Sequence, residues 1–552
     1  MLRLTDIKLP LDHVELALRH AVVAKLKIAD AALLDLRIAK RSYDARKRGA
    51  ILLIYAVDVS VRDEAAILAR FAGDAHVGLA PDTTYRAVAQ APAILPLRPL
   101  VIGFGPCGLF AALILAQMGF RPIVLERGKA VRERTRDTWD LWRKRNLHPE
   151  SNVQFGEGGA GTFSDGKLYS QIRDPQHRGR KVLSEFAKAG APEEILYVAK
   201  PHIGTFRLVS MIENMRKEIE SLGGEIRFGQ RVDDLRIETD SRGERQLRGV
   251  TLADGSEIEA DHVVLALGHS ARDTFTMLHE RGVYVEAKPF SIGFRIEHPQ
   301  SLIDQARFGP HAGHPILGAA DYKLVHHCNG DHAGRGRSVY SFCMCPGGTV
   351  VAATSEPGHV VTNGMSQYSR NERNANAAIV VGIEPSDFAP FDASGSPLAG
   401  IALQRALERH AYVLGGENYN APAQRVGDFI ASRASTGLGN VTPSFQPGVS
   451  PVSLDSALPD YAIAAIREAL PAFGRQLRGF DMHDAVLTAV ETRTSSPIRI
   501  KRDETLQSLN TRGLYPAGEG AGYAGGILSA GVDGINVAEA VALSITARYS
   551  RS

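Results

Sequence analysis

The sequence contains a glycine-rich turn whose spacing suits the binding of a diphosphate. An apolar strand over 100–102 runs into Gly103-Phe-Gly105-Pro-Cys-Gly108, a G-x-G-x-x-G pattern. The first glycine permits a tight turn, the second lets the backbone approach a pyrophosphate, and the third lets the next helix pack closely on a sheet. We expect that helix over 109–118, with phosphates at its N-terminus, where free N–H groups favour anions.

An acidic residue stands where a ribose would need it. A second apolar strand over 122–125 ends at Glu126, 23 residues after Gly103. A carboxylate at the end of this strand can accept hydrogen bonds from ribose hydroxyls. Because strand, helix, second strand and acid follow one another in order, this stretch predicts a dinucleotide-binding βαβ unit.

Two later segments fit neighbouring parts of the same domain. Residues 251–261 read as a hairpin with an Asp-Gly turn, and a buried-type strand over 262–267 then ends at Gly268. Near the C-terminus, the segment 513–520 precedes a glycine-studded helix that starts at Gly525. These three segments, in this order, resemble the FAD domain of the glutathione-reductase-like flavoprotein superfamily. The usual aspartate of the last segment is here Glu519, which departs from that pattern.

The resemblance extends to a narrower family. Phe155–Lys167, Phe342–Gly348, Asn363–Ser366 and Gly518–Gly526 resemble a bacterial and plastid family of uncharacterised FAD-dependent dehydrogenases. This likeness covers essentially the whole chain and implies FAD as the cofactor, but it assigns no substrate.

The resemblance also implies which residues contact FAD. Residues 158–162 would lie against the isoalloxazine ring, where glycine is needed because a side chain would collide, and the helix from Gly525 would direct its N-terminus at the pyrimidine edge. The implied cofactor-binding residues are Gly103, Gly105, Pro106, Cys107, Gly108, Glu126, Arg127, Gly158, Gly159, Ala160, Gly161, Thr162, Val232, Ala266, Gly268, Gly518, Glu519, Gly525, Gly526 and Ile527.

Other nucleotide sites have less support. Gly161–Lys167 nearly matches a P-loop, but Leu168 replaces the hydroxyl that would hold magnesium, and no clear strand precedes it. No second nucleotide-binding domain is recognisable between Glu126 and Asp261. We therefore expect NAD(P)H, if it reduces the flavin, to dock transiently.

Candidate catalytic side chains are Lys167, Cys343, Cys345 and Tyr523. Thiolates beside a flavin can pass electrons, although the C-x-C spacing strains a direct disulfide. Packing within a Phe-Cys-Met-Cys strand is the alternative for both cysteines. Lys167 and Tyr523 could polarise a substrate carbonyl or contact FAD only. Arg493 is a candidate anion contact.

Several histidines raise the question of a metal. They are His298, His311, His314, His326, His327 and His332. No carboxylate or cysteine spacing in the sequence completes a recognisable site around them. We expect no metal.

The chain divides into four segments that must position these residues. We expect an α/β protein with a Rossmann-like, discontinuous FAD-binding domain at 94–282 and 501–552. An α+β substrate or cap domain over 283–500 is inserted into it. Residues 1–93 read as a small N-terminal α/β domain whose βαββα pattern suggests a ferredoxin-like type. A proline-spaced linker over 91–99 separates it from the rest.

The N-terminal domain carries a basic stretch between two apolar segments. Its basic residues are Arg37, Lys40, Arg41, Arg46, Lys47 and Arg48. They could dock RNA, or they could form the solvated face of a two-strand unit, which we favour.

Composition limits the remaining possibilities. The 552 residues are 44% hydrophobic and 23% charged with a net charge of +3, which is typical of a soluble protein without a dedicated nucleic-acid or membrane surface. Four cysteines make no disulfide scaffold, the N-terminus has no apolar signal run, and no stretch reaches the roughly 18 apolar residues of a membrane span. We expect a cytoplasmic protein without a membrane partner.

These observations lead to one expected function and two alternatives. We expect an FAD-dependent oxidoreductase that exchanges a hydride between the flavin and a small-molecule substrate. The alternatives are an FAD-dependent RNA-modifying enzyme that uses the basic N-terminal domain, and a non-catalytic flavin-binding redox sensor. Glycine makes up 54 residues, nearly a tenth against a usual value of about 7%, and much of it lies in the segments above.

Overall fold

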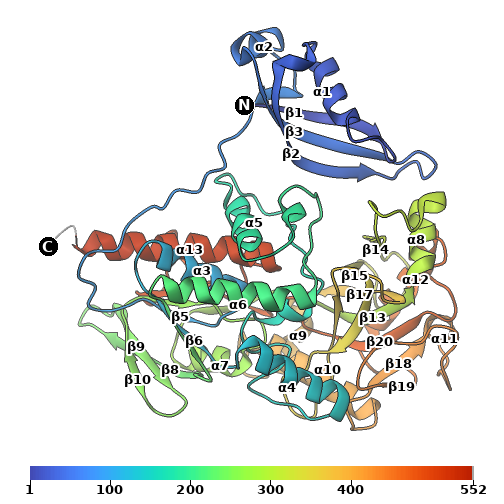
Figure 1. Ribbon diagram of the computed structural model, residues 1–552. Helices are drawn as coiled ribbons and strands as arrows, with labels where there is room; N and C mark the ends of the chain where they lie inside the picture. Colours follow the sequence, from blue (N-terminus) through green and yellow to red (C-terminus); the bar gives the residue numbers. More distant parts are fainter. Residues whose placement is uncertain (550–552) are drawn as a thin grey trace.

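The N-terminal unit (residues 1–79) is a four-stranded antiparallel sheet with two helices on one face (Figure 1). A computed structural model describes residues 1–549 of the chain. The strands are β1 (Leu2–Pro10), β2 (Leu33–Asp44), β3 (Leu52–Val61) and β4 (Val77–Leu79), in the order β2-β3-β1-β4, and the helices are α1 (Ala17–Leu26) and α2 (Glu64–Arg70). Alternate residues of β3 are buried, because one face of the sheet packs against the helices. The element order is the βαββαβ of a split βαβ unit.

Two details differ from the sequence expectation. The first helix of the expected βαββα pattern, which the sequence favours over 12–26, begins only at Ala17, since residues 11–16 form turns and an irregular stretch. The short strand β4 was not anticipated, because three residues at an edge give no period to recognise.

Backbone hydrogen bonds attach the N-terminal unit to the rest of the molecule. The N–H of Arg41 donates to the carbonyl of Tyr197 at 2.7 Å, and the N–H of Ala199 donates back to the Arg41 carbonyl at 2.9 Å. On the other side, the rings of Tyr43 and Phe308 meet edge to face. An extended linker then leads down to the parallel sheet (Figure 1).

A five-stranded parallel sheet forms the middle layer of the next unit. Its order is β22-β11-β5-β6-β7, with strands β22 (Leu514–Pro516), β11 (Val263–Leu265), β5 (Leu100–Ile102), β6 (Ile123–Glu126) and β7 (Glu225–Phe228). The side chains of alternate residues face opposite layers, so Val101 packs toward helices while Leu100 and Ile102 pack toward a second sheet. We call this the parallel-sheet unit.

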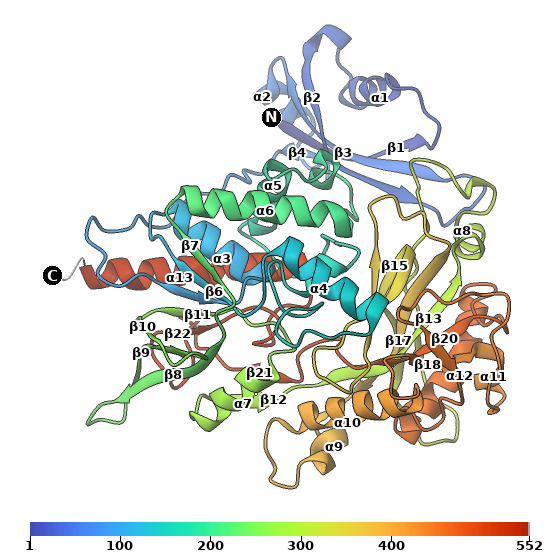
Figure 2. The same ribbon diagram turned by 60° about the horizontal axis from the view of Figure 1, so that its bottom comes forward.

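Helices cover one face of the parallel sheet and a small antiparallel sheet covers the other (Figures 1 and 2). The helices are α3 (Pro106–Gln117), α5 (Arg178–Lys188), α6 (Thr205–Ser221) and α13 (Ile527–Tyr549). The second sheet consists of β8 (Val232–Thr239), β9 (Arg245–Leu252) and β10 (Glu257–Glu259), next to α7 (Arg272–Glu280). The expected helix over 109–118 thus exists and begins three residues earlier, inside the glycine turn.

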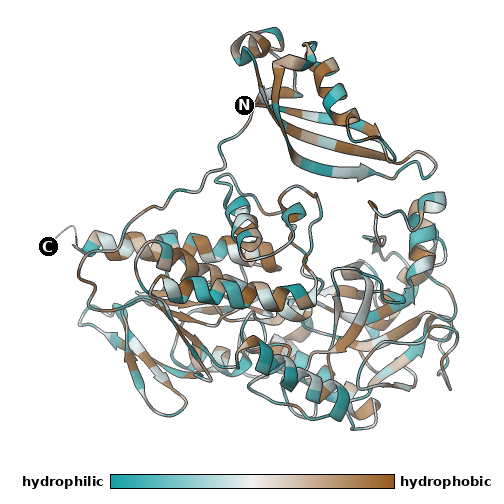
Figure 3. Cartoon of the chain, in the orientation of Figure 1, coloured by the Kyte–Doolittle hydropathy of each residue, from teal (hydrophilic) through white to brown (hydrophobic). Residues whose placement is uncertain are grey.

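Helix α13 is long and apolar enough to cross a membrane by length and composition, which the sequence analysis did not anticipate. In the molecule 67% of that stretch is buried. Its apolar residues, brown in Figure 3, include several that pack in the core with α3. A Cβ on Gly534 of α13 would overlap the Cys107 carbonyl oxygen of α3. The apolar run is therefore accounted for by core packing.

The remaining unit is built on an eight-stranded sheet. Its strands are β13 (Phe290–Pro299), β14 (Val325–His327), β15 (Ser338–Ala352), β16 (Thr362–Ser366), β17 (Asn374–Ile383), β18 (Ala421–Arg425), β19 (Val449–Pro451) and β20 (Val486–Glu491). The helices are α8 (Gln300–Phe308), α9 (Pro385–Phe388), α10 (Ala399–Leu414), α11 (Val426–Ile430) and α12 (Asp460–Gln476). We call this the eight-stranded unit.

Two elements connect the units. A two-stranded sheet of β12 (Val285–Ala287) and β21 (Ile498–Ile500) lies where the chain enters and leaves the eight-stranded unit (Figure 2). Helix α4 (Val131–Lys144) follows β6, and its Trp142 donates its indole N–H to the Ala352 carbonyl of β15 at 2.9 Å.

Candidate functional site

The first glycine turn is shaped by the strands beneath it. Gly103 has a φ of +96°, and a Cβ on it would lie 2.6 Å from the carbonyl oxygen of Ala266 at the end of β11. A Cβ on Gly108 would overlap the Gly103 carbonyl. Gly105 is different, because its nearest neighbour would be the Cα of Gly159 at an ordinary 3.6 Å. The outer side of Gly105 is therefore free for a ligand to approach.

Glu126 organises the backbone around this turn. Its carboxylate is 5% exposed and accepts three backbone N–H groups, from Phe104 at 2.9 Å, Gly128 at 2.8 Å and Gly156 at 2.9 Å. A carboxylate offers about four acceptor positions, so capacity remains for a ribose hydroxyl. The residue expected to bind a ribose thus also fixes the turn on which the diphosphate would lie.

The second glycine segment packs directly on the first. The N–H of Gly158 donates to the Phe104 carbonyl at 2.8 Å, and the 3₁₀ turn Ala160–Phe163 with Thr162 follows. A Cβ on Gly161 would lie 3.1 Å from Ile527 and 3.6 Å from Pro106. Because Pro106 begins α3 and Ile527 begins α13, two helix N-termini meet at this glycine.

The third glycine segment closes the same region. A Cβ on Gly518 would lie 2.9 Å from the Cys107 side chain, so Cys107 acts as a small residue in this contact. Gly268 and Gly525, by contrast, have open space beside them and are exposed, as is Gly526. Segments from four distant parts of the sequence thus form one backbone-lined cradle, with two helix N-termini at its edge. A dinucleotide fits this donor set, since backbone N–H groups bind phosphate and glycines admit close approach.

Two further predicted contacts lie at the edge of the cradle. The Arg127 guanidinium lies 4.1 Å from the Phe155 ring centroid and pairs with Glu150 and Asp273, each at 2.8 Å. The side chain of Val232 is buried in the core beneath the sheet, so only its backbone could contact a ligand.

The candidate catalytic residues Lys167, Cys343 and Cys345 come together, although they lie far apart in sequence. The Lys167 ammonium donates to the carbonyl of Met344, between the two cysteines, and lies 3.9 Å from the Asp165 carboxylate. In a P-loop, the lysine side chain folds back over the glycine turn that precedes it. The Lys167 side chain instead contacts Met344, and this excludes the P-loop alternative. Burial lowers the pKa of Lys167, but the neighbouring Cys345, Cys343 and Asp165 raise it by more, so the pKa lies above its usual value.

Cys343 has an unusual backbone and an acidic thiol. Its φ is +44° at a bulge of β15, and its side chain is half-buried, whereas Cys345 is fully buried. A hydrogen bond from Cys345 lowers the pKa of Cys343 to about 6, and the charges of Lys167 and Arg295 act in the same direction against burial. For Cys345, the same hydrogen bond and burial raise the pKa. Thiolate character thus concentrates on Cys343.

Glu519 connects the cradle to this cluster. Burial, opposed by the charge of Lys288 and aided by the neighbouring Cys343, raises the pKa of Glu519 to about 7. The Lys288 ammonium lies 3.4 Å from the Ser495 hydroxyl, and Ser495 lines a cavity of about 290 Å³. Phe342 lines the same cavity, one residue before Cys343.

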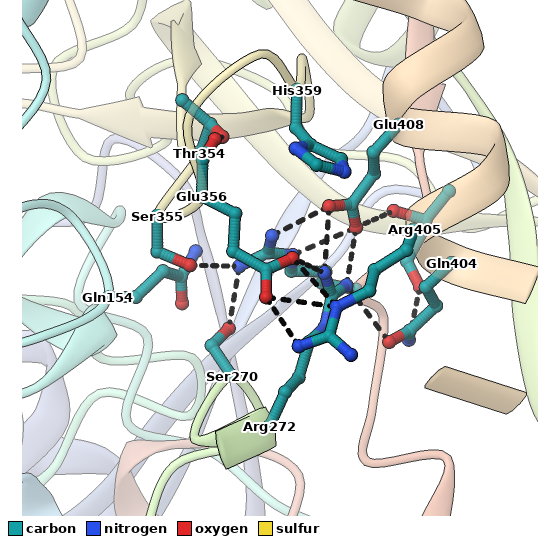
Figure 4. Close-up of polar contacts among 12 residues, drawn as sticks. Gln154, Ser270, Arg272, Thr354, Ser355, Glu356, His359, Gln404, Arg405 and Glu408 are labelled. Carbon is teal, nitrogen blue, oxygen red and sulfur yellow. Dashed lines mark hydrogen bonds and ion pairs between the residues drawn. The ribbon is translucent and has the colours of Figure 1, made fainter. Parts of the chain in front are cut away.

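Two candidates from the sequence lie outside the cluster. The Tyr523 ring covers the Arg502 guanidinium at 3.8 Å, and its hydroxyl accepts the Arg502 backbone N–H at 3.1 Å. Arg493 was a candidate anion contact, and in the structure its anionic partner is the protein's own Glu408. Its guanidinium binds the buried Glu408 carboxylate at 2.9 and 2.7 Å and also contacts the hydroxyls of Ser270 and Ser355. Figure 4 shows Glu408 and these two serines.

Matches to known proteins agree with the cradle. Residues 289–494 match a family model described as FAD-dependent protein, C-terminal domain-like, and residues 154–284 match flavin containing amine oxidoreductase. Residues 1–60 match a domain of unknown function. An uncharacterised protein of Clostridium beijerinckii is 45% identical over 538 residues, which are 98% of each chain. The chain belongs to a family of FAD-dependent oxidoreductases.

FAD is the cofactor that these matches support for this oxidoreductase. The expected membership in an FAD-dependent family is confirmed, while the glutathione-reductase-like superfamily and the bacterial and plastid distribution stay predictions.

Solved structures of flavoenzymes are also similar to this FAD-dependent oxidoreductase, but with much lower sequence identity. An L-amino acid deaminase from Proteus vulgaris is 12% identical, covering 83% of this chain and 96% of that chain with a TM-score of 0.36. A flavoprotein/dehydrogenase from Cytophaga hutchinsonii is 11% identical, covering 82% and 79% with a TM-score of 0.33. Likeness at this level carries no inference about substrate.

Three residues of the site were missed by the sequence analysis. Arg134 of α4 is fully buried and donates to the carbonyls that shape residues 152–157, including Asn152 and Val153, each at 2.7 Å. Asp165 pairs with Arg370 at 2.9 Å below Lys167. Nothing in the sequence marks these side chains, because each is one charge among many and gains its role only through contacts made in the fold.

Proposed function

We propose that this oxidoreductase uses FAD to exchange a hydride with a small molecule bound between the parallel-sheet unit and the eight-stranded unit. The observation that carries the proposal is the continuity between the cradle and the reactive cluster. Glu519 follows Gly518 of the cradle directly, and its ionisation responds to Cys343 of β15.

The same proposal assigns the domains. Residues 94–282 and 501–552 form a discontinuous, Rossmann-like FAD-binding domain, and 283–500 form the substrate or cap domain. The pairing of β22 with β11 supports this division, since it joins strands from before and after the eight-stranded unit in one parallel sheet. The N-terminal unit is assigned to the ferredoxin-like type from its strand order.

The chain's own residues have distinct tasks in this scheme. Glu126 would bind the adenosine ribose, the N-terminus of α3 would bind the pyrophosphate, and the N-terminus of α13 would face the flavin. When bound, FAD supplies two-electron chemistry by hydride transfer. Lys167 holds a positive charge beside the Cys343 thiolate, and a Glu519 carboxyl with a pKa near 7 can take up or release a proton at neutral pH.

The substrate is proposed to be small. The cavity of about 290 Å³ next to Phe342 and Ser495 approaches the lower end of the volumes typical for small-molecule sites. A nicotinamide donor that docks transiently stays a prediction from the sequence.

An RNA-modifying enzyme is not favoured. The matches are to flavin-related models, and several basic residues of β2 are already engaged. Arg37 pairs with Asp35 at 2.9 Å, and the Arg41 guanidinium lies over the Tyr197 ring.

The proposal is tested by the spectrum of the purified protein. We expect yellow protein that releases FAD on denaturation, and anaerobic stopped-flow mixing with NADPH or NADH should bleach the flavin. Protein that neither contains nor takes up FAD would contradict the proposal. Protein that binds FAD but is reduced by no nicotinamide and by no candidate substrate would favour the redox sensor instead.

A further inference from the structure

A cluster of metal-binding side chains lies where β14 meets α12, apart from the cradle. His326 lies in β14, Cys328 comes directly after the last residue of that strand, and Glu468 lies on α12. The Nε2, Sγ and carboxylate oxygen atoms of these residues all lie within 4.8 Å of one another. The sequence analysis expected no metal because Glu468 is 142 residues from His326 and comes near it only when α12 packs on the hairpin.

The loop after Cys328 is built to approach α12 closely. A Cβ on Gly330 would lie 2.8 Å from the Glu468 carboxylate, and one on Gly334 would lie 2.7 Å from the Tyr461 carbonyl. The Cys328 thiol points at the same helix, 3.7 Å from the Ala465 carbonyl, one turn before Glu468. Glycines at these two positions let the loop and the helix come into contact.

His332 orients the carboxylate from outside. Its Nδ1 accepts the Gly334 N–H at 3.0 Å, so the ring proton is on Nε2, which donates to Glu468 Oε2 at 2.5 Å. The N–H groups of Asn329 and Gly330 also donate to this carboxylate, at 3.2 and 3.1 Å. Oε1 is directed at His326 Nε2, 2.7 Å away. A histidine that orients a ligating carboxylate is a usual companion of a metal site.

We propose that His326 Nε2, Cys328 Sγ and a Glu468 carboxylate oxygen bind a divalent metal of the zinc class. Tetrahedral zinc with bonds of about 2.0–2.3 Å needs donor atoms about 3.5 Å apart, so the widest pair would close by about 1 Å from the present limit of 4.8 Å, and His326 Nε2 and Glu468 Oε1, now 2.7 Å apart, would separate by about 1 Å. One nitrogen, one thiolate and one carboxylate oxygen are a mixed set that zinc accepts, and a water would complete the four-coordinate site. The side chains are partly accessible, since His326 is 19% and Glu468 20% exposed, so an ion can enter.

Metal content and coordination test the proposal on the full-length FAD-loaded protein. After dialysis with zinc and removal of free ion, we expect about one zinc per chain by mass spectrometry. Zinc X-ray absorption should show one sulfur ligand, and zinc should raise the melting temperature by mass action. The variants Cys328→Ser and Glu468→Gln should each lower the zinc content at least tenfold.

His327→Gln is the matched control. His327 is the neighbour of both ligands, but its Nδ1 contacts the Ser338 hydroxyl across the hairpin, so zinc content should not change. Less than a tenth of a zinc per chain in the wild type, or equal zinc in the wild type and Cys328→Ser, would overturn the proposal. Should a variant fail to fold, a zinc X-ray absorption spectrum of the wild type without a sulfur ligand would overturn it equally.

Discussion

The backbone N–H of Gly158 donates to the carbonyl of Phe104 at 2.8 Å, which fastens the second glycine segment to the first. Gly159 packs on the Cα of Gly105 in the same contact, and the Gly156 N–H is held by Glu126. The backbone therefore holds the cradle in place through its own hydrogen bonds, and substitutions in it can be separated into those that disturb the fold and those that disturb only the ligand.

Gly105→Val should remove FAD without unfolding the protein. A Cβ at this position meets only the Gly159 Cα at 3.6 Å, and Gly105 has an ordinary φ of −75°. The added atoms would occupy the side from which a pyrophosphate approaches. We expect FAD affinity, measured by fluorescence titration, to fall at least about tenfold, or about 1.4 kcal/mol.

Two substitutions serve as controls for this experiment. Gly78→Val, in β4 with open space around it, should leave FAD affinity unchanged. Gly108→Ala should prevent folding instead, because its Cβ overlaps the Gly103 carbonyl. If Gly105→Val retained FAD as tightly as the wild type, the assignment of the diphosphate to this turn would be wrong.

Glu126→Gln should weaken both the turn and FAD binding. The carboxylate accepts three backbone N–H groups, and an amide replaces one acceptor oxygen by a donor that faces them. Leaving a buried N–H unpaired costs about 1–3 kcal/mol. Urea unfolding of the apoprotein should show this loss, and FAD titration a further loss of affinity. Unchanged stability of the apoprotein would contradict the role of Glu126 in fixing the turn.

These cases show which parts of the site a sequence can reveal. The turn at 103–108 is predictable because its requirements are local: a positive φ at Gly103 and close packing at Gly108 leave glycine as the only choice. Ion pairs between residues far apart in sequence leave no local sequence pattern. Arg493 lies 85 residues from Glu408, and their contact depends on how α10 packs against the segment after β20. For this reason the sequence suggested a ligand contact for Arg493 and gave no sign of its pairing with Glu408.

The thiol of Cys343 should react at lower pH than an ordinary cysteine. With a pKa of about 6, its thiolate forms as the pH rises through 6, whereas buried Cys345 and Cys107 stay protonated. Iodoacetamide labelling, resolved by peptide mass spectrometry, should therefore reach half its maximal rate at Cys343 near pH 6. Lys167→Met should move this midpoint upward, since it removes a positive charge beside the thiolate, while Lys200→Met at the surface should not. A wild-type midpoint near pH 8.5, the value of a free cysteine, would contradict the assignment.

Glu519 should make the protein less stable as the pH rises toward neutrality. Its pKa in the folded protein is about 7, above the value of about 4.3 for an unfolded chain. Between these values the folded state holds a proton that the unfolded state has released, so the free energy of unfolding falls with increasing pH. Urea unfolding of the wild type and Glu519→Gln should give a difference in stability that changes between about pH 4 and 7 and is constant above. A difference that does not vary with pH would show that Glu519 is not protonated in the folded protein.

Glu408→Ala should cause a large loss of stability. Glu408 is fully buried and accepts hydrogen bonds from the guanidinium groups of Arg272 and Arg493 and from the Thr492 hydroxyl. Figure 4 shows Arg272 beside Glu408. Burial alone would raise the pKa of Glu408, but the two arginines hold it well below its usual range.

Removing the Glu408 carboxylate would deprive two buried guanidinium groups of the anion that they share. Breaking a buried ion pair in this way typically lowers the free energy of unfolding by about 3–5 kcal/mol. Arg405→Ala provides the comparison, because Arg405 is 43% exposed and within residues 1–549 forms an ion pair only with Glu356. Its loss should cost less than about 1 kcal/mol. Urea unfolding of both variants measures the two losses. If the two losses of stability were equal, the buried pairing would contribute no more than a surface salt bridge. The charge of Arg493 would then need another partner, such as the anionic ligand that the sequence first suggested.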